Sequence, residues 1–326
     1  MGLQIKEIVL KEEISLDNLK GKIIAVDAFN VLYQFLTTIR QYDGSPLMDS
    51  KGNITSHLSG LFYRTTNLMS RGIKPIFVFD GIAPKLKHRT QEKRLEIKEE
   101  AEKKLRECKS IEEKAKYASR VSYLSEEMIE ESKELIKALG LAVIEAPSEG
   151  EAQAAYIVKK EDAYAVASQD YDSLLFGAPR LIQNLTLAKT RKLSSGMITA
   201  IHPQLIDLNK FLKTLGISRE QLICLGILVG TDYNPKGIMG IGQKTALKIV
   251  KEHKSPQNIF KEIEKKYELD FDWKEIFDLF MNPKVNKNYS IKFSKINIDK
   301  VKKILIKKHE FPCPKLFTLT GRFPHY

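Results

Sequence analysis

Short apolar runs that each end in a carboxylate constrain this chain more than any other feature. The runs KIIAVD, PIFVFD and AYAVASQD end at Asp27, Asp80 and Asp170, and a fourth run, LAVIEAP, leads into Glu149 and Glu151. These runs are continuously apolar and alternate with helical patterns, which is typical of parallel strands covered on both faces. The sequence therefore predicts an α/β fold with a mostly parallel central sheet flanked by helices.

The acids that follow these strands are expected to lie at one edge of the sheet. The carboxyl ends of parallel strands meet there, and ligands of such sheets bind beyond those ends. Seven carboxylates without matching cations would repel one another, and hard oxygen ligands favour Mg²⁺, with Mn²⁺ as a substitute. Seven exceed the needs of one ion, so the pattern favours a two-metal site for phosphoryl chemistry. The predicted metal ligands are Asp27, Asp80, Glu149, Glu151, Asp170, Asp172 and Asp232.

Each of these acids also has a purely structural interpretation. An Asp after a strand, such as Asp27, is often the N-cap of the next helix. Ser148 and Glu151 fit the S-x-x-E pattern of a capping box. The other acids that follow strands and helices lie in turn-like sequences. Taken one at a time, these positions leave both interpretations open.

Residues 85–120 form a strongly charged segment with 13 Lys or Arg and 8 Glu. A helix of this composition has no apolar stripe with which to dock, so it is either solvated or ordered by a partner. The segment begins five residues after Asp80, and Lys87 and Arg94 are two helical turns apart on one face. We therefore expect an arch or lid over 85–135 and a catalytic cation pair that binds the scissile phosphate.

The sequence GIMGIGQKTALKIV at 237–250 indicates a backbone site for phosphate. Its glycines allow backbone N–H groups to approach an anion, and the helix that follows adds its positive end. Together with the apolar helix before it, this segment predicts a helix-hairpin-helix at about 220–250 that grips DNA without reading its sequence. An ordinary helix C-cap turn is the alternative. The predicted contacts are Gly237, Gly240, Gly242, Lys244 and Thr245.

Charge and composition exclude several protein classes. The net charge is +12, and residues 282–326 alone hold 11 basic residues against 2 acids, which favours a polyanion such as nucleic acid as the partner. No apolar run is long enough for a membrane span, and the first residues do not read as a signal peptide. The three cysteines have neither disulfide-framework nor zinc-site spacing. We expect a reduced, cytoplasmic protein with no membrane partner.

The motifs, in this order, resemble those of the archaeal type of flap structure-specific endonucleases. The matching stretches are VDAFNVLYQFLTTIRQ, TSHLSGLFYRT, FVFDGIAPKLK, EAPSEGEAQAAY, ASQDYDSLLFG and LVGTDYNPKGIMGIGQKTAL. The resemblance implies an N-terminal nuclease region at 1–98, an internal nuclease region at 137–260 and a C-terminal helical region with a basic, atypical tail at 261–326. It also implies metal-dependent cleavage at junctions of single- and double-stranded DNA, with 5′-3′ exonuclease activity, in Okazaki fragment maturation and long-patch base excision repair.

The resemblance assigns further residues to DNA. Tyr33 matches an aromatic that stacks a base, Arg40 lies in the same N-terminal stretch, and Thr55, Ser56 and His57 match the region that receives the upstream duplex. The family often holds K⁺ at the hairpin, and these enzymes act as monomers with a sliding clamp. Only Leu319 and Phe323 fit the clamp motif here, so the motif is degenerate.

Three other functions fit the sequence less well. A related 5′-nuclease acting on bubbles or four-way junctions would carry larger insertions and paired protomers. A phosphatase with a nucleophilic Asp would have a second Asp two residues after it, but Phe29 follows Asp27 at that spacing. A DNA-binding protein without activity would gain nothing from acids that face phosphates. Dependence on a divalent metal separates the nuclease from simple binding.

Overall fold

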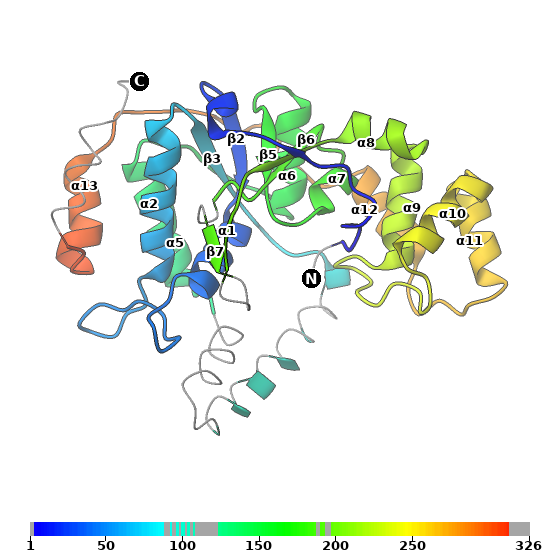
Figure 1. Ribbon diagram of the computed structural model, residues 1–326, viewed down its shortest axis with the longest axis horizontal. Coiled ribbons are helices and arrows are strands. Elements are labelled where there is room, and N and C mark those ends of the chain that lie inside the picture. The colour runs from blue at the N-terminus through cyan, green and yellow to red at the C-terminus, as the bar shows by residue number, and fades with distance from the viewer. Residues whose placement is uncertain are drawn as a thin grey trace. The chain divides into compact units, whose positions relative to one another are not determined.

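The computed structural model describes residues 3–87, 123–186, 190–192 and 197–312, together with scattered positions between 92 and 107 (Figure 1). The chain divides into two compact units that alternate along the sequence. The first unit comprises residues 1–15, 80–91 and 145–287, and the second comprises 16–79, 92–144 and 288–326. Each unit is therefore built from segments that are distant in sequence.

Four strands of the first unit lie side by side in the order β1-β9-β6-β5. β5 and β6 are parallel, whereas β9 runs antiparallel to both β6 and β1. A separate hairpin pairs β7 with β8. The strands are β1 (Glu12–Glu13), β5 (Ala165–Ala167), β6 (Arg180–Gln183), β7 (Thr190–Lys192), β8 (Ile198–Ala200) and β9 (Gln204–Asp207).

The helices of the first unit are built around one buried helix. Every residue from Gln221 to Leu228 in α9 is buried, and α10 and α11 lie beside α9 in Figure 1. Phe280 of α12 packs against Phe176 and Tyr233, with ring centroids 4.9 and 5.4 Å apart. The helices are α6 (Gly150–Lys159), α7 (Asp172–Leu175), α8 (Leu208–Leu215), α9 (Arg219–Val229), α10 (Gln243–His253), α11 (Pro256–Glu264) and α12 (Trp273–Met281), and a 3₁₀ turn covers Lys85–Lys87.

The second unit contains the strands β2, β3 and β4, and β2 is parallel to β3 in the register Asp27 to Val78. Both strands are buried over nearly their whole length, as continuously apolar parallel strands should be. Figure 1 shows α2, α5 and α13 side by side. The elements are a 3₁₀ turn (Leu16–Leu19), β2 (Ile23–Asp27), α1 (Ala28–Thr38), α2 (Ser56–Ser70), β3 (Lys74–Phe79), α5 (Glu126–Ala138), β4 (Val143–Glu145), α13 (Ile298–Lys302) and a π-helix (Lys303–Lys308).

The architecture confirms the predicted α/β class. The apolar runs that end in acid form β2, β3 and β5, and the fourth run forms β4. Two antiparallel pairings at β9 are the departure from an all-parallel arrangement. Among the described residues, no helix is both long enough and apolar enough to cross a membrane.

Candidate active site

Six of the seven predicted metal ligands belong to the first unit, and two of them pair with Lys87. The six are Asp80, Glu149, Glu151, Asp170, Asp172 and Asp232. Asp27, the seventh, belongs to the second unit, where it is the N-cap of α1 and its Oδ1 accepts a hydrogen bond from the Asn30 amide at 3.1 Å. The capping interpretation of Asp27 is therefore confirmed.

The segment that carries Asp80 runs beside the start of α6. The Gly150 amide donates to Asp80 Oδ1 at 2.6 Å, and the Gly81 amide donates to the Ser148 carbonyl at 2.7 Å. A side chain at Gly81 would place its Cβ 2.2 Å from the carbonyl oxygen of Ala146, so only glycine allows this approach. The close backbone pairing thereby holds Asp80 next to Glu149, the N-cap residue of α6.

Ser168 connects two of the other acids. Its hydroxyl donates to Glu151 Oε1 at 3.1 Å and accepts from the amide of Asp170 at 3.2 Å. The alternative interpretation of Ser148 and Glu151 as a capping box does not hold, because Glu149 is the N-cap and its side chain makes no capping bond to α6. Glu151 is directed to Ser168 instead, so the S-x-x-E pattern did not reflect a helix cap.

Lys87 neutralises part of the acidic cluster. Its ammonium lies 2.7 Å from Glu149 Oε2 and 3.4 Å from Asp232 Oδ2, and its side chain is only 15% exposed. Burial alone would lower the pKa of Lys87, but the charges of Glu149, Asp232 and Asp80 outweigh it and raise that pKa. Lys87 is therefore a permanent cation held by carboxylates.

The remaining groups show an excess of negative charge. Burial, together with the charges of Asp232 and Asp170, raises the pKa of Asp172 far above its usual value, although the Leu3 amide donates to its Oδ1 at 3.1 Å. Burial, and then the charge of Glu149, raises the pKa of the Tyr233 hydroxyl as well. Carboxylates whose ionisation is this unfavourable fit a site completed by additional cations.

Several of the carboxylates already accept hydrogen bonds or form an ion pair within the protein. Within the described ranges, no three His, Cys, Asp or Glu side chains converge closely enough to hold one metal ion. Lys87, the Gly150 amide, the Ser168 hydroxyl and the Leu3 amide each bind at least one of these acids. A metal would therefore have to compete with these donors for the same oxygen atoms.

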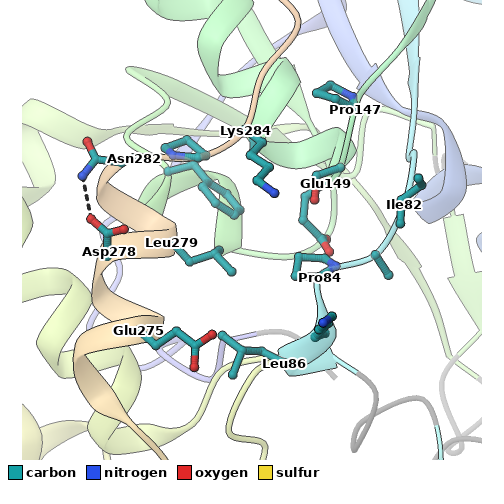
Figure 2. Close-up of a pocket in the computed structure, with 16 residues that line it drawn as sticks. Ile82, Pro84, Leu86, Pro147, Glu149, Glu275, Asp278, Leu279, Asn282 and Lys284 are labelled. Carbon is teal, nitrogen blue, oxygen red and sulfur yellow. Dashed lines mark hydrogen bonds between the residues drawn. The ribbon is translucent and has the colours of Figure 1, made fainter.

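A cavity of about 570 Å³ adjoins Glu149 in the first unit. Figure 2 shows Glu149 facing the space between the turn that contains Pro84 and the residues Leu279 and Asn282 at the end of α12. The lining is largely apolar, and Lys85, Lys284 and Glu275 supply charges. The acidic cluster is thus bordered by space into which a substrate could extend.

The segment predicted to form the hairpin connects α9 to α10. Gly237 and Gly240 have φ values of 56° and 86°, which glycine adopts readily, and Gly242 is the N-cap of α10. Among the residues that the structure describes, no side chain caps the α10 N-terminus. Lys244 and Thr245 are in its first turn, and Lys244 is exposed with its ammonium 3.4 Å from Glu7.

Other predicted DNA-binding residues lie in the second unit and differ in exposure. The Tyr33 side chain is 43% exposed on α1, whereas Thr55, Ser56 and His57 are buried at the start of α2. Arg40 donates to the carbonyls of Gly44 and Thr37, at 2.7 and 3.3 Å. The side chains of Thr55, Ser56 and His57 are packed inside the unit, and their assignment to the region that receives the upstream duplex stays a prediction. Arg94 lies outside the described residues.

Sequence reasoning missed several residues that position the site. Leu3 and Ser168 bind the metal-ligand candidates, and Gln153 is fully buried with its amide paired to both backbone groups of Asn286 at 2.7 and 2.9 Å. No local pattern marks a backbone amide such as that of Leu3. The sequence did contain a signal for Gln153, because it is a polar residue among the apolar residues that follow Glu151 and would need a hydrogen-bond partner if buried.

Comparison with known proteins agrees with this geometry. Residues 2–101 match the XPG N-terminal domain, and residues 140–232 match the XPG I-region. The chain is 51% identical to "Flap endonuclease 1" of Hyperthermus butylicus, with 95% of this chain and 91% of that protein covered.

Solved structures give the same result. The flap endonuclease-1 of Methanococcus jannaschii is 43% identical, covers 98% of this chain and 97% of its own, and superposes with a TM-score of 0.79. The catalytic core of Rad2 in complex with DNA substrate is 25% identical, with 95% and 94% of the two chains covered and a TM-score of 0.72. The chain belongs to the flap endonuclease family of XPG-type nucleases, and it is a structure-specific 5′-flap endonuclease.

Proposed function

We propose that the acidic cluster of the first unit holds two Mg²⁺ ions, with Mn²⁺ able to substitute, and hydrolyses a phosphodiester at the base of a 5′ flap. The family is metal-dependent, and DNA is its partner. The observation that carries the proposal is the nearly buried Lys87 ammonium between Glu149 and Asp232, in a cluster where burial raises the pKa of Glu149 and of Asp172. The assignment of Asp27 as a seventh ligand stays a prediction.

Bound divalent ions would supply a nucleophilic water and neutralise charge on the phosphate. In the reaction, the water oxygen forms a bond to phosphorus while the bond to the 3′ oxygen breaks. The 3′ oxygen takes up a proton and leaves as a hydroxyl, and the 5′ product keeps the phosphate. Lys87 is placed at the cluster to donate a charge-assisted hydrogen bond to a phosphate oxygen and stabilise its developing charge. Arg94 is proposed as its partner.

The hairpin is proposed to hold the duplex. Its glycines and the N-terminus of α10 offer backbone N–H groups to a phosphate, and Lys244 and Thr245 add side-chain donors. A K⁺ ion at this hairpin is part of the proposal. Tyr33, exposed on α1, is proposed to stack on a base, and Arg40 to support the segment that receives the upstream duplex.

The cellular role follows from the substrate. We propose that the enzyme acts as a cytoplasmic monomer in Okazaki fragment maturation and long-patch base excision repair. A sliding clamp is the expected partner from the family, although the end of the chain departs from its binding motif.

The test is cleavage of labelled 5′-flap DNA, blunt duplex and single strand by the pure protein, with Mg²⁺ or with a chelator. Metal-dependent cutting at the flap base, with the other two substrates largely intact, supports the proposal. Flap binding without cutting in Mg²⁺ would overturn it and leave a binding protein. Equal cutting of all three substrates would remove the junction specificity.

A further inference from the structure

A chain of charged side chains in the second unit is not used by the proposed catalysis. The His309 side chain is only 2% exposed and lies between two carboxylates: Nδ1 is 2.9 Å from Asp49 Oδ2, and Nε2 is 3.1 Å from Glu131 Oε1. Lys308 also pairs with Glu131. Glu131 comes from α5 and Asp49 from the loop between α1 and α2, so His309 ties three segments together.

The same region makes a second connection one residue later. The Glu310 carboxylate accepts from both the amide and the hydroxyl of Ser50, at 3.1 and 2.8 Å. Glu310 has a φ of 57°, a left-handed conformation that costs a non-glycine residue energy and is kept only where other contacts impose it. The contacts with Ser50 therefore help to hold the backbone of Glu310 in this conformation.

Asp49 organises the loop that His309 holds. Its Oδ1 accepts from the amides of Lys51 and Asn53 at 3.0 and 2.8 Å, and its Oδ2 accepts from the Asn53 side chain at 2.9 Å. The carboxylate of Asp49 thus accepts hydrogen bonds from two residues of the turn at 49–53 and helps to hold that turn together. Bridges between Arg40 and Pro46 and between Met48 and Ile54 shape the rest of loop 40–55.

The loop presents side chains that packing inside the unit does not explain. Tyr42 is fully exposed and Met48 is 46% exposed, whereas the residues behind them at the start of α2 are buried. A fully exposed aromatic residue on a hydrogen-bonded loop is suited to stack on a base or sugar of DNA. The residues that contact DNA in this region would then be those of the loop, with the buried ones serving as its support.

We propose that His309 and Glu310 are positioning residues that fix loop 40–55 in the conformation that contacts the upstream duplex. The two ring nitrogens of His309 lie within hydrogen-bond distance of Asp49 and Glu131, so the imidazole bridges the loop to α5. Burial would raise the pKa of Asp49, but the hydrogen bonds of Asn53 and His309 outweigh it and lower that pKa, so Asp49 is an anion that needs this partner. The proposal rests on the proposed DNA contact of this region.

The variants His309→Gln and Glu310→Gln test the proposal. His309→Gln removes the imidazole ring that reaches Asp49 and Glu131 through its two opposed nitrogens. Glu310→Gln weakens the contact with Ser50 while changing only an exposed side chain. His202→Gln, at an exposed histidine of the first unit, is the matched control. We expect KM for a 5′-flap substrate to rise about tenfold for His309→Gln, as loss of one charge-assisted hydrogen bond would give, with kcat within about twofold.

Hydrogen exchange of the free variants supplies the second readout. The backbone amides of residues 47–55 should exchange faster in both variants than in the wild type, and at the wild-type rate in the control. The unfolding temperature of Glu310→Gln should stay near that of the wild type. Faster loop exchange with an unchanged KM would overturn the positioning role, because the loop would not touch the substrate. Unchanged exchange would overturn the structural link itself. Failure of the proposed function is separate, because the wild type would then not cut flaps at all.

Discussion

At the scale of single residues, the site is held together by charges that only partly cancel. Lys87 is nearly buried, and its ammonium pairs with the carboxylates of Glu149 and Asp232. A buried ion pair contributes little net stability, but removal of one partner leaves the others unpaired and is costly. The lysine therefore has two separable effects, one on the folded protein without metal and one on the reaction.

Lys87→Ala should show both effects. Without divalent metal, its unfolding temperature should fall below that of the wild type, because Glu149 and Asp232 lose their partner. Mg²⁺ should restore most of that loss, since the ions supply positive charge to the same carboxylates. In saturating Mg²⁺ the single-turnover cleavage rate of the variant should remain about 100-fold below that of the wild type, because the lysine that donates a hydrogen bond to the phosphate is missing. Lys213→Ala, at an exposed lysine of α8, is the control. An unchanged single-turnover rate would remove Lys87 from the reaction.

Asp172→Asn should separate stability from activity. Because the folded-state pKa of Asp172 lies above its unfolded value, its ionisation opposes folding once the pH exceeds that unfolded value. The metal-free variant should therefore be more stable than the wild type at pH 8, by about 2 kcal/mol, while cleavage is lost. Urea unfolding in chelator and a flap-cleavage assay measure the two effects. Lower stability at pH 8 would contradict the assigned direction.

At the scale of elements, sequence patterns predicted the strands and the hairpin but not the use of side chains within them. Continuous apolar runs ending in acid correspond to β2, β3 and β5, since burial on both faces leaves a strong pattern. The S-x-x-E pattern at Ser148 and Glu151 left a helix cap open as an alternative, but the Glu151 carboxylate accepts a hydrogen bond from Ser168, a residue distant in sequence. His57, predicted to belong to the region that receives the upstream duplex, is buried beside Glu131, a neighbour 74 positions away that no local signal identifies.

His57 should make the protein sensitive to acid. Burial lowers the pKa of His57 to about 4, and neither ring nitrogen has a hydrogen-bond partner among the described residues. Between about pH 6.5 and about pH 4 the unfolded chain binds a proton that the folded chain does not, so folding stability falls as the pH falls. The full effect is about 3 kcal/mol. Unfolding free energies at about pH 7.5 and about pH 5 should therefore differ less for His57→Gln than for the wild type and for the control His202→Gln. Equal differences in all three proteins would refute the assignment.

Two glycines of the hairpin should respond differently to alanine. A Cβ at Gly237 would lie 2.4 Å from the backbone of Val229, and φ there is positive, so Gly237→Ala should cost stability. Gly242 has open space around its Cβ position and a negative φ, so Gly242→Ala should leave the unfolding temperature unchanged. If backbone amides there grip a phosphate, Gly242→Ala should still weaken duplex binding. Unchanged affinity in Gly242→Ala would place the phosphate elsewhere.

At the scale of the whole molecule, the interleaving of the two units was outside the reach of sequence reasoning. The predicted regions were continuous stretches, whereas each unit combines segments that lie far apart along the chain. Contacts such as that of His309 with Asp49 join residues 260 positions apart. Periodicity reports the face that an element buries, but it does not report the distant segment that covers that face.

The distribution of charge over the molecule leads to a prediction about salt. The net charge of +12 reflects an excess of basic residues, among them the exposed Lys244 of the hairpin, whose attraction to phosphates is screened by added ions. A plot of the logarithm of the binding constant for flap DNA against the logarithm of the salt concentration should therefore fall with a slope of about 0.9 for each phosphate contacted. Lys244→Gln should reduce the steepness of this plot by about 1. The pair of Lys87 with Glu149 is buried and far less screened, so the single-turnover rate at saturating enzyme should stay nearly constant over the same salt range. A rate that falls in parallel with affinity would mean that exposed charges act in the chemical step as well as in binding.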